Sequence, residues 1–188
     1  MMQNLWQKKL KLNYSKDVFD IVQFGSSVME GELPNDVDIA VIFHQISLKN
    51  QLNESQNIKK QIQNNVDIPV HVKSFDLYSF FNKSNFARES IFFGKSLIFG
   101  DYFSQRFGIY PRIHISYSLK DLKKKDKIRF NYLLSGKGGG YGLLRKYKGI
   151  LLNPGLIEIF PEYLEIFTEA IKKIISKFEV RRVFLGIK

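Results

Sequence analysis

The most constraining feature of the sequence is a pair of aspartates at the start of a strongly apolar stretch. Residues 37–43 are Val-Asp-Ile-Ala-Val-Ile-Phe, a composition that predicts a buried strand, and Asp36 comes directly before it. Because side chains alternate across a strand, Asp36 and Asp38 lie on one face, about 7 Å apart. Two carboxylates held together on a buried strand are costly unless a cation neutralises them. The pattern therefore predicts a site for a hard divalent cation, Mg²⁺ or Mn²⁺, with Asp36 and Asp38 as its ligands.

A glycine and two serines stand just upstream of this pair. The β-prone run 18–24 ends at Gly25-Ser26-Ser27, and nine residues, 27–35, separate Ser26 from Asp36. A turn of this kind after a strand can open a short helix, and it presents backbone N–H groups and hydroxyls to phosphate oxygens. Gly25, Ser26 and Ser27 are therefore candidate nucleotide-binding residues, contacting the phosphates of an NTP held by the same cation.

The order of strand, Gly-Ser, spacer and Asp-x-Asp strand resembles the signature of the DNA polymerase β superfamily of nucleotidyltransferases. Its small branch, the minimal nucleotidyltransferases, is most similar in size. Residues 88–91, Arg-Glu-Ser-Ile, and 94–99, Gly-Lys-Ser-Leu-Ile-Phe, are similar to the continuation of that pattern, so the resemblance covers residues 15–101. It implies a small mixed β-sheet flanked by helices. It also implies Mg²⁺-dependent transfer of a nucleoside monophosphate from an NTP to a hydroxyl group of an acceptor.

The family has a third carboxylate on the following strand, which we expect at residues 68–75. Matching its Pro-hydrophobic-Asp-hydrophobic form to Pro69-Val70-His71-Val72 puts His71 in the place of the acid, the alternative that we favour. Sliding the match by four residues makes Asp67 the third acid instead. Period-two geometry puts both on one face, and a histidine there can act as a general base or a weaker ligand. The candidate catalytic residues are therefore Asp36, Asp38, His71 and Asp67.

Positive charge is concentrated in the C-terminal part of the chain. Residues 111–188 hold 17 Lys and Arg against 7 Asp and Glu, a net charge of +10 out of +11 for the whole chain. Such asymmetry favours a polyanionic partner, nucleic acid before an anionic membrane surface. Two basic clusters accompany Tyr141 and Tyr147, and basic residues interleaved with aromatics can hold phosphates and stack bases. The candidate nucleic-acid-binding residues are Lys123, Lys124, Lys125, Lys127, Arg129, Arg145, Lys146 and Lys148.

The remaining pattern predicts an α+β chain with two domains, a nucleotidyltransferase domain at 1–110 and a basic domain at 111–188. The predicted helices span residues 48–63, 77–81, 86–93, 119–134, 141–147 and 161–178. Asn153-Pro154-Gly155 predicts the turn of a hairpin, and residues 180–185 a final strand. This order of helices and hairpin in the second domain is compatible with a winged-helix-like nucleic-acid module.

The chain contains no cysteine and no apolar run near the length of a membrane span, so we expect a cytoplasmic protein that does not enter membranes.

Three hypotheses about function follow. The first hypothesis is an enzyme whose acceptor is RNA, with a protein side chain or a small molecule as alternatives. The second is a nucleotidyltransferase-like protein that has lost its chemistry and acts as a nucleic-acid-binding or regulatory module. The third is a structural or partner-binding protein whose basic half binds an acidic partner protein.

Overall fold

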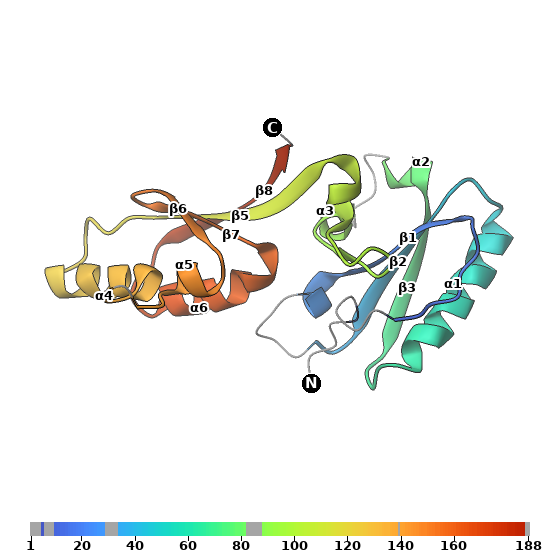
Figure 1. Ribbon diagram of the computed structural model, residues 1–188, viewed down its shortest axis with the longest axis horizontal. Helices are drawn as coiled ribbons and strands as arrows, with labels where there is room; N and C mark the ends of the chain where they lie inside the picture. Colours follow the sequence, from blue (N-terminus) through green and yellow to red (C-terminus); the bar gives the residue numbers. More distant parts are fainter. Residues whose placement is uncertain (1–4, 6–9, 29–33, 82–87, 139, 187–188) are drawn as a thin grey trace. The chain divides into compact units, whose positions relative to one another are not determined.

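The computed structural model describes residues 5, 10–28, 34–81, 88–138 and 140–186. The chain is a mixed α+β protein with two four-stranded sheets (Figure 1). The described residues up to Ile109 form one compact unit, and those from Tyr110 onward form another. We call them the first and the second unit and treat each by itself.

The sheet of the first unit has the strand order β3-β2-β1-β4. Strand β1 (Val18–Phe24) pairs antiparallel with both β2 (Val37–Phe43) and β4 (Lys95–Ser96), whereas β3 (Val70–Asp76) runs parallel to β2. A parallel pair needs a crossover connection, and helix α1 (Leu48–Gln63) provides it. The shorter helical segments are the 3₁₀ helices η1 (Gly25–Val28) and η2 (Phe103–Phe107) and helices α2 (Leu77–Phe80) and α3 (Arg88–Phe92).

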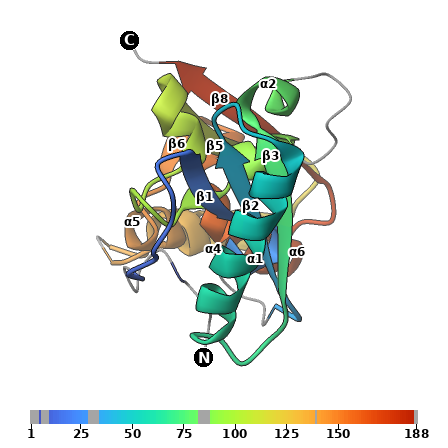
Figure 2. The ribbon, with the colours of Figure 1, turned by 90° about the vertical axis from the view of Figure 1, so that its right-hand side faces the viewer.

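The two faces of this sheet are covered differently. Helix α1 lies along one face (Figure 2), where its Ile58 and Ile62 pack with alternate residues of β2, namely Val37, Ile39, Val41 and Phe43. The other face holds Ala40 and Ile42 of β2 against a largely aromatic cluster that contains Phe24, Phe80 and Phe103. Because side chains alternate, Asp38 belongs to this second face. The aspartate pair therefore lies on the opposite side of the sheet from α1.

The sheet of the second unit has the order β6-β7-β5-β8. Strands β6 (Ile150–Asn153) and β7 (Leu156–Ile159) form an antiparallel hairpin, β7 pairs antiparallel with β5 (Ile109–Tyr117), and β8 (Phe178–Gly186) is an edge strand. Helices α4 (Lys124–Ser135), α5 (Leu143–Lys146) and α6 (Leu164–Lys172) and the 3₁₀ helix η3 (Pro161–Tyr163) complete the unit. The nearly buried Glu158 of β7 is balanced by His114, 3.0 Å away, and by Arg112, 3.6 Å away.

Most predicted elements are confirmed, with three corrections. The predicted helix 161–178 begins with the 3₁₀ turn η3 and ends at Lys172, because the chain turns there and Phe178 opens β8. The helix predicted from residue 119 begins only at Lys124, and the strand predicted from residue 68 begins at Val70, directly after Pro69. Phe86, at the start of the predicted helix 86–93, lies outside the described residues.

Candidate functional site

The pairing register of three strands brings the predicted aspartates together with His71. Asp38 lies opposite Phe24 of β1 on one side and opposite His71 of β3 on the other. Asp36 precedes β2 at the same edge, and its Oδ2 is 3.4 Å from Nδ1 of His71. The end of β1 and the starts of β2 and β3 thus meet at one edge of the sheet, with two carboxylates and an imidazole.

Only glycine fits at position 25, because of its backbone conformation and because of the nearby Asp38 side chain. Its φ of +76° is in the left-handed region, where residues with a side chain are strained. A Cβ at this position would lie 2.9 Å from Oδ2 of Asp38. The backbone of the Gly-Ser turn is therefore seated directly against the Asp38 carboxylate, and any side chain there would displace it.

The serines of the turn have different roles. Ser26 is exposed, whereas Ser27 is buried and its Oγ donates a hydrogen bond to the carbonyl of Phe24, 3.1 Å away. The buried Gln23 donates from Nε2 to the carbonyl of Ser27 at 3.0 Å. Ser27 and Gln23 thus hold the shape of η1. The hydroxyl of Ser26 and the turn's backbone are the groups available to a ligand.

Burial and charge act together on Asp38. Desolvation raises the pKa of its carboxyl, and the negative charge of Asp36 raises it further, while Lys73 and His71 act in the opposite direction. Lys73 is two residues after His71 on β3 and pairs with Ala40, so it extends from the same face as Asp38. The sequence pattern did not single it out as a site residue, although the period-two spacing from His71 was a usable signal.

Asp67, the alternative third acid, is exposed and lies before β3 begins. The register places His71, four residues later, opposite Asp38. Within the described part of the chain, no group of three or more His, Cys, Asp and Glu side chains is arranged to hold a metal ion. The site therefore offers two carboxylates with a neighbouring histidine.

A further carboxylate of the first unit, that of Asp20 on β1, was not predicted as notable from the sequence. It is fully buried, and its Oδ1 accepts hydrogen bonds from Ser96 Oγ and the backbone N–H of Ile21, both at 2.7 Å. Its Oδ2 is buried without a hydrogen-bond partner among the described residues. Burial raises the pKa of this carboxyl to about 7, more than its hydrogen bonds and the charge of Arg106 lower it.

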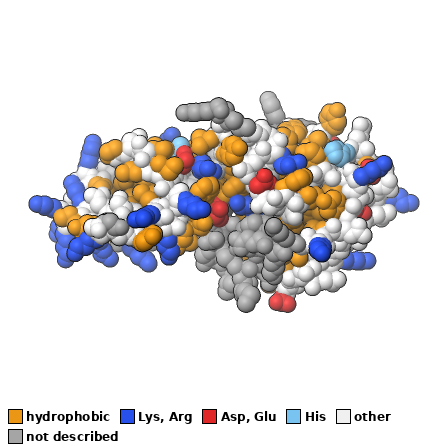
Figure 3. All heavy atoms as spheres, viewed as in Figure 1, with side chains coloured by type: hydrophobic (Ala, Val, Ile, Leu, Met, Phe, Trp, Pro, Cys, Tyr) orange, Lys and Arg blue, Asp and Glu red, His pale blue; other side chains and the backbone are white. Residues whose placement is uncertain are grey.

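The predicted basic clusters lie on two helices of the second unit. Lys123 is the N-cap of α4, and Lys124, Lys125 and Lys127 follow in its first turns, with Arg129 one turn later. Figure 3 shows Lys and Arg side chains gathered over the part of this unit that contains α4. Arg145, Lys146 and Lys148, in or just after α5, are exposed, and the guanidinium of Arg145 lies 4.5 Å from the ring centre of Tyr141.

Comparison of the chain with protein-family models, with curated proteins and with solved structures finds no match. No helix in the described ranges has both the length and the apolar character that crossing a membrane requires. Two features of the chain are therefore candidates for its function. One is the edge formed by β1, β2 and β3, and the other is the basic surface of the second unit.

Proposed function

We propose that this chain is a Mg²⁺-dependent nucleotidyltransferase of the DNA polymerase β type that transfers a nucleoside monophosphate from an NTP to a hydroxyl group, with RNA as the favoured acceptor. One observation carries the proposal. The Gly25 backbone lies against Asp38, at an edge where Asp36 and His71 also meet. A phosphate-binding turn and a carboxylate pair in direct contact are what binding of a metal–triphosphate complex needs.

The donor set fits the proposed cation. Mg²⁺ in proteins is commonly bound by one or two carboxylates, with phosphate oxygens and water completing its six ligands. Asp36 and Asp38 supply two such carboxylates, so the third acid is not required to hold an ion that the NTP also binds. The bound ion would neutralise charge on the triphosphate and on the leaving pyrophosphate. Lys73, which lowers the pKa of Asp38, adds a positive charge on the same face.

The chain's own groups account for substrate contacts and proton transfer. The N–H groups of the turn and the Ser26 hydroxyl bind phosphate oxygens. As the acceptor oxygen bonds to the α-phosphorus and the bond to the β-phosphate oxygen breaks, the acceptor proton passes to Nε2 of His71. Asp36 lies beside Nδ1, 3.4 Å away, and can hold the tautomer that leaves Nε2 free to accept that proton.

The second unit supplies the acceptor-binding surface in this proposal. Lysines at a helix N-terminus are unfavourable, because the helix dipole is positive there. Helix α4 nevertheless begins with Lys123, Lys124 and Lys125, and Asp126 is the acidic residue of its first turn. Lysines that lower the stability of the helix are consistent with a role of these side chains in contacting phosphates. We propose that α4, α5 and the β6–β7 hairpin serve this role in the manner of a winged-helix module.

A second candidate function follows from the composition of the site. His71, the residue that we matched to the family's third acid, pairs with Asp38, and no three-ligand cluster is present in the described residues. These two observations favour a protein that keeps the nucleotide and nucleic-acid surfaces and has lost transfer. The acceptor surface of the second unit would be the same in both functions.

Label transfer distinguishes the two. Purified protein is incubated with α-labelled NTPs, Mg²⁺ or Mn²⁺, and total RNA or cell lysate, beside an Asp36→Asn/Asp38→Asn variant. Label that reaches RNA or protein with wild type and not with the variant supports the transferase and identifies its acceptor class. RNA binding without any transfer, under conditions where metal–NTP binding is retained, favours the binding module.

A further inference from the structure

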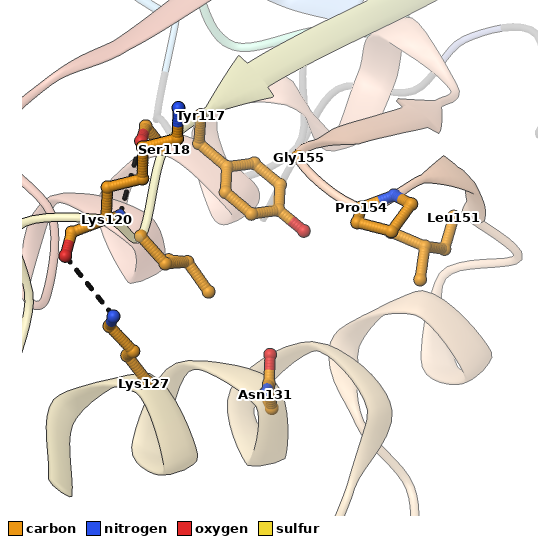
Figure 4. Close-up of a pocket in the computed structure, with 9 residues that line it drawn as sticks. Tyr117, Ser118, Lys120, Lys127, Asn131, Leu151, Pro154 and Gly155 are labelled. Carbon is orange, nitrogen blue, oxygen red and sulfur yellow. Dashed lines mark hydrogen bonds between the residues drawn. The ribbon is translucent and has the colours of Figure 1, made fainter. Parts of the chain in front are cut away.

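The proposed acceptor surface of the second unit contains a pocket that has not been given a role of its own. It has a volume of about 520 Å³ and lies between the end of β5, helix α4 and the turn of the β6–β7 hairpin (Figure 4). Its walls are built by Tyr117, Leu151 and Pro154, and its polar groups come from Lys120, Lys127 and Asn131. A volume in this range is typical of sites for small organic ligands.

The pocket presents one supported aromatic ring, that of Tyr117. The half-buried ring of Tyr117 packs on Phe130, with ring centres 4.7 Å apart, so its position is supported from behind. In Figure 4 the hydroxyl end of Tyr117 points towards Leu151 and Pro154. Its oxygen is hydrogen-bonded to the backbone of Gly155 in the turn, which lowers the pKa of the phenol, whereas burial raises it by more. The ring of Tyr117 is therefore held at both ends, and an aromatic ring is a surface on which nucleic-acid bases stack.

The polar groups of the pocket suit a base edge and a phosphate. The side chain of Asn131, an exposed residue of α4, extends into the pocket in Figure 4. An amide offers a donor and an acceptor, as a base edge does. Nζ of Lys127 donates to the carbonyl of Lys120 at 3.2 Å, which holds one ammonium group at the rim. The described lining contains no acidic residue.

We infer that this pocket binds one nucleotide unit of a single-stranded nucleic acid, with the base against the ring of Tyr117 and near Asn131, and the phosphate at Lys120 and Lys127. The inference deepens the proposed function, on which it rests for the role of the bound strand. A base paired in a duplex cannot stack on Tyr117 inside the pocket, so the pocket selects unpaired nucleotides.

The surroundings favour a strand over a free nucleotide. A second pocket, of about 490 Å³, shares Ser118 with the first and is lined by Lys172, Lys173 and Lys177 together with Asp121. Positive charge therefore continues beyond the space that one nucleotide fills. Nζ of Lys172 donates to Glu169 at 2.9 Å, so Lys173 and Lys177 are the groups that neighbouring phosphates of a strand can use, whereas a mononucleotide cannot reach both pockets.

The test uses two alanine variants of α4 in the full-length chain. Asn131→Ala removes the amide from the pocket, and Ser135→Ala, an exposed position at the end of the same helix, is the matched control. Both are made in the Asp36→Asn/Asp38→Asn background and assayed without metal or NTP, so that the result does not depend on transferase activity. Binding is measured with a 12-nucleotide single-stranded RNA, the same sequence as a duplex, and UMP.

We expect Asn131→Ala to weaken single-strand binding by about fivefold, the effect of one or two lost hydrogen bonds, with Ser135→Ala and duplex binding unchanged. A 4-thiouridine in the strand should crosslink to residues 117–155. Equal binding by both variants, or crosslinks confined to other residues, would overturn the inference. UMP binding as tight as the strand would assign the pocket to a free nucleotide, and equal competition by poly-glutamate would assign it to an acidic peptide.

Discussion

Two features of Gly25 disfavour any side chain at this position. Its φ is positive, and a Cβ would lie too close to the Asp38 carboxylate. We predict that Gly25→Ala weakens metal–NTP binding by about tenfold or more, since the added Cβ pushes the turn away from the Asp38 carboxylate. The variant also loses about 1 kcal/mol of stability from backbone strain. Isothermal titration calorimetry with Mg²⁺ and an NTP, together with thermal unfolding, measures both effects.

Gly100 provides the matched control for this substitution. Its φ of +81° imposes similar strain, yet a Cβ there would meet nothing within 4 Å. Gly100→Ala should therefore lose a comparable amount of stability and keep metal–NTP binding. Equal loss of binding in the two variants would show that the Gly25 effect is general destabilisation and not contact with Asp38.

Asp20 makes the free energy of unfolding depend on pH. The pKa of its carboxyl is 3.8 in the unfolded chain and about 7 in the folded protein. At pH values between these two, the folded state therefore binds more protons than the unfolded state. The free energy of unfolding therefore falls as pH rises from about 4 to about 7, by about 4 kcal/mol in all, and is lowest above that range.

Asp20→Asn should remove this dependence. Asparagine keeps an acceptor for Ser96 and Ile21 and carries no charge, so the variant is expected to be more stable than wild type at pH 8 and similar at pH 4. Urea unfolding at both pH values measures this, with Asp67→Asn at an exposed position as control. A variant less stable than wild type at pH 8 would contradict a buried, protonatable carboxyl.

At the scale of helices and strands, local signals predicted the elements that surround the site. Strands β1 and β2 and helix α1 have the predicted limits, because glycine ends β1, apolar runs define both strands, and the Ser47 side chain accepts from the backbone N–H of Asn50 at the start of α1. The end of α6 was not predictable in this way. Apolar residues continue past Lys172, so the sequence pattern does not mark the end of the helix. Phe178 belongs instead to strand β8, which pairs with β5, a strand far away in the sequence.

Helix α4 is predicted to bind RNA through its first turn. Replacing Lys123, Lys124 and Lys125 by alanine should weaken RNA binding and reduce its salt dependence by about 0.7–0.9 in log–log slope for each lost phosphate contact. The helix should not be destabilised, because these charges oppose its dipole. Anisotropy titrations at several salt concentrations and a thermal melt measure both.

Three lysines of α1 offer a control of equal charge. Alanine at Lys49, Lys59 and Lys60 removes the same charge from the first unit and should change RNA affinity little. An unchanged salt slope in the α4 variant, or an equal change in the α1 variant, would remove the first turn of α4 from the binding surface.

At the scale of the whole molecule, the two units differ in the residues that they contain. The first holds Asp36, Asp38 and the turn that begins at Gly25, and residues 111–188, in the second, hold a net charge of +10. Composition predicted this division of charge. The position of Lys73 near Asp38 could have been predicted from its period-two spacing from His71. The meeting of Tyr117, Asn131 and Leu151 in one pocket could not, because they come from separate elements with no common spacing. These contacts depend on long-range pairing.

Mg²⁺-dependent binding of an NTP analogue with a methylene group between the α- and β-phosphates, which cannot be transferred, is the decisive measurement for the proposed metal–nucleotide site. Wild type is compared with Asp38→Asn and with Asp67→Asn, the same change at an exposed aspartate before β3. We predict that Asp38→Asn weakens binding by about tenfold or more, through loss of a charged contact, while Asp67→Asn and wild type bind alike. Equal binding by Asp38→Asn and wild type would contradict a metal–nucleotide site at the start of β2.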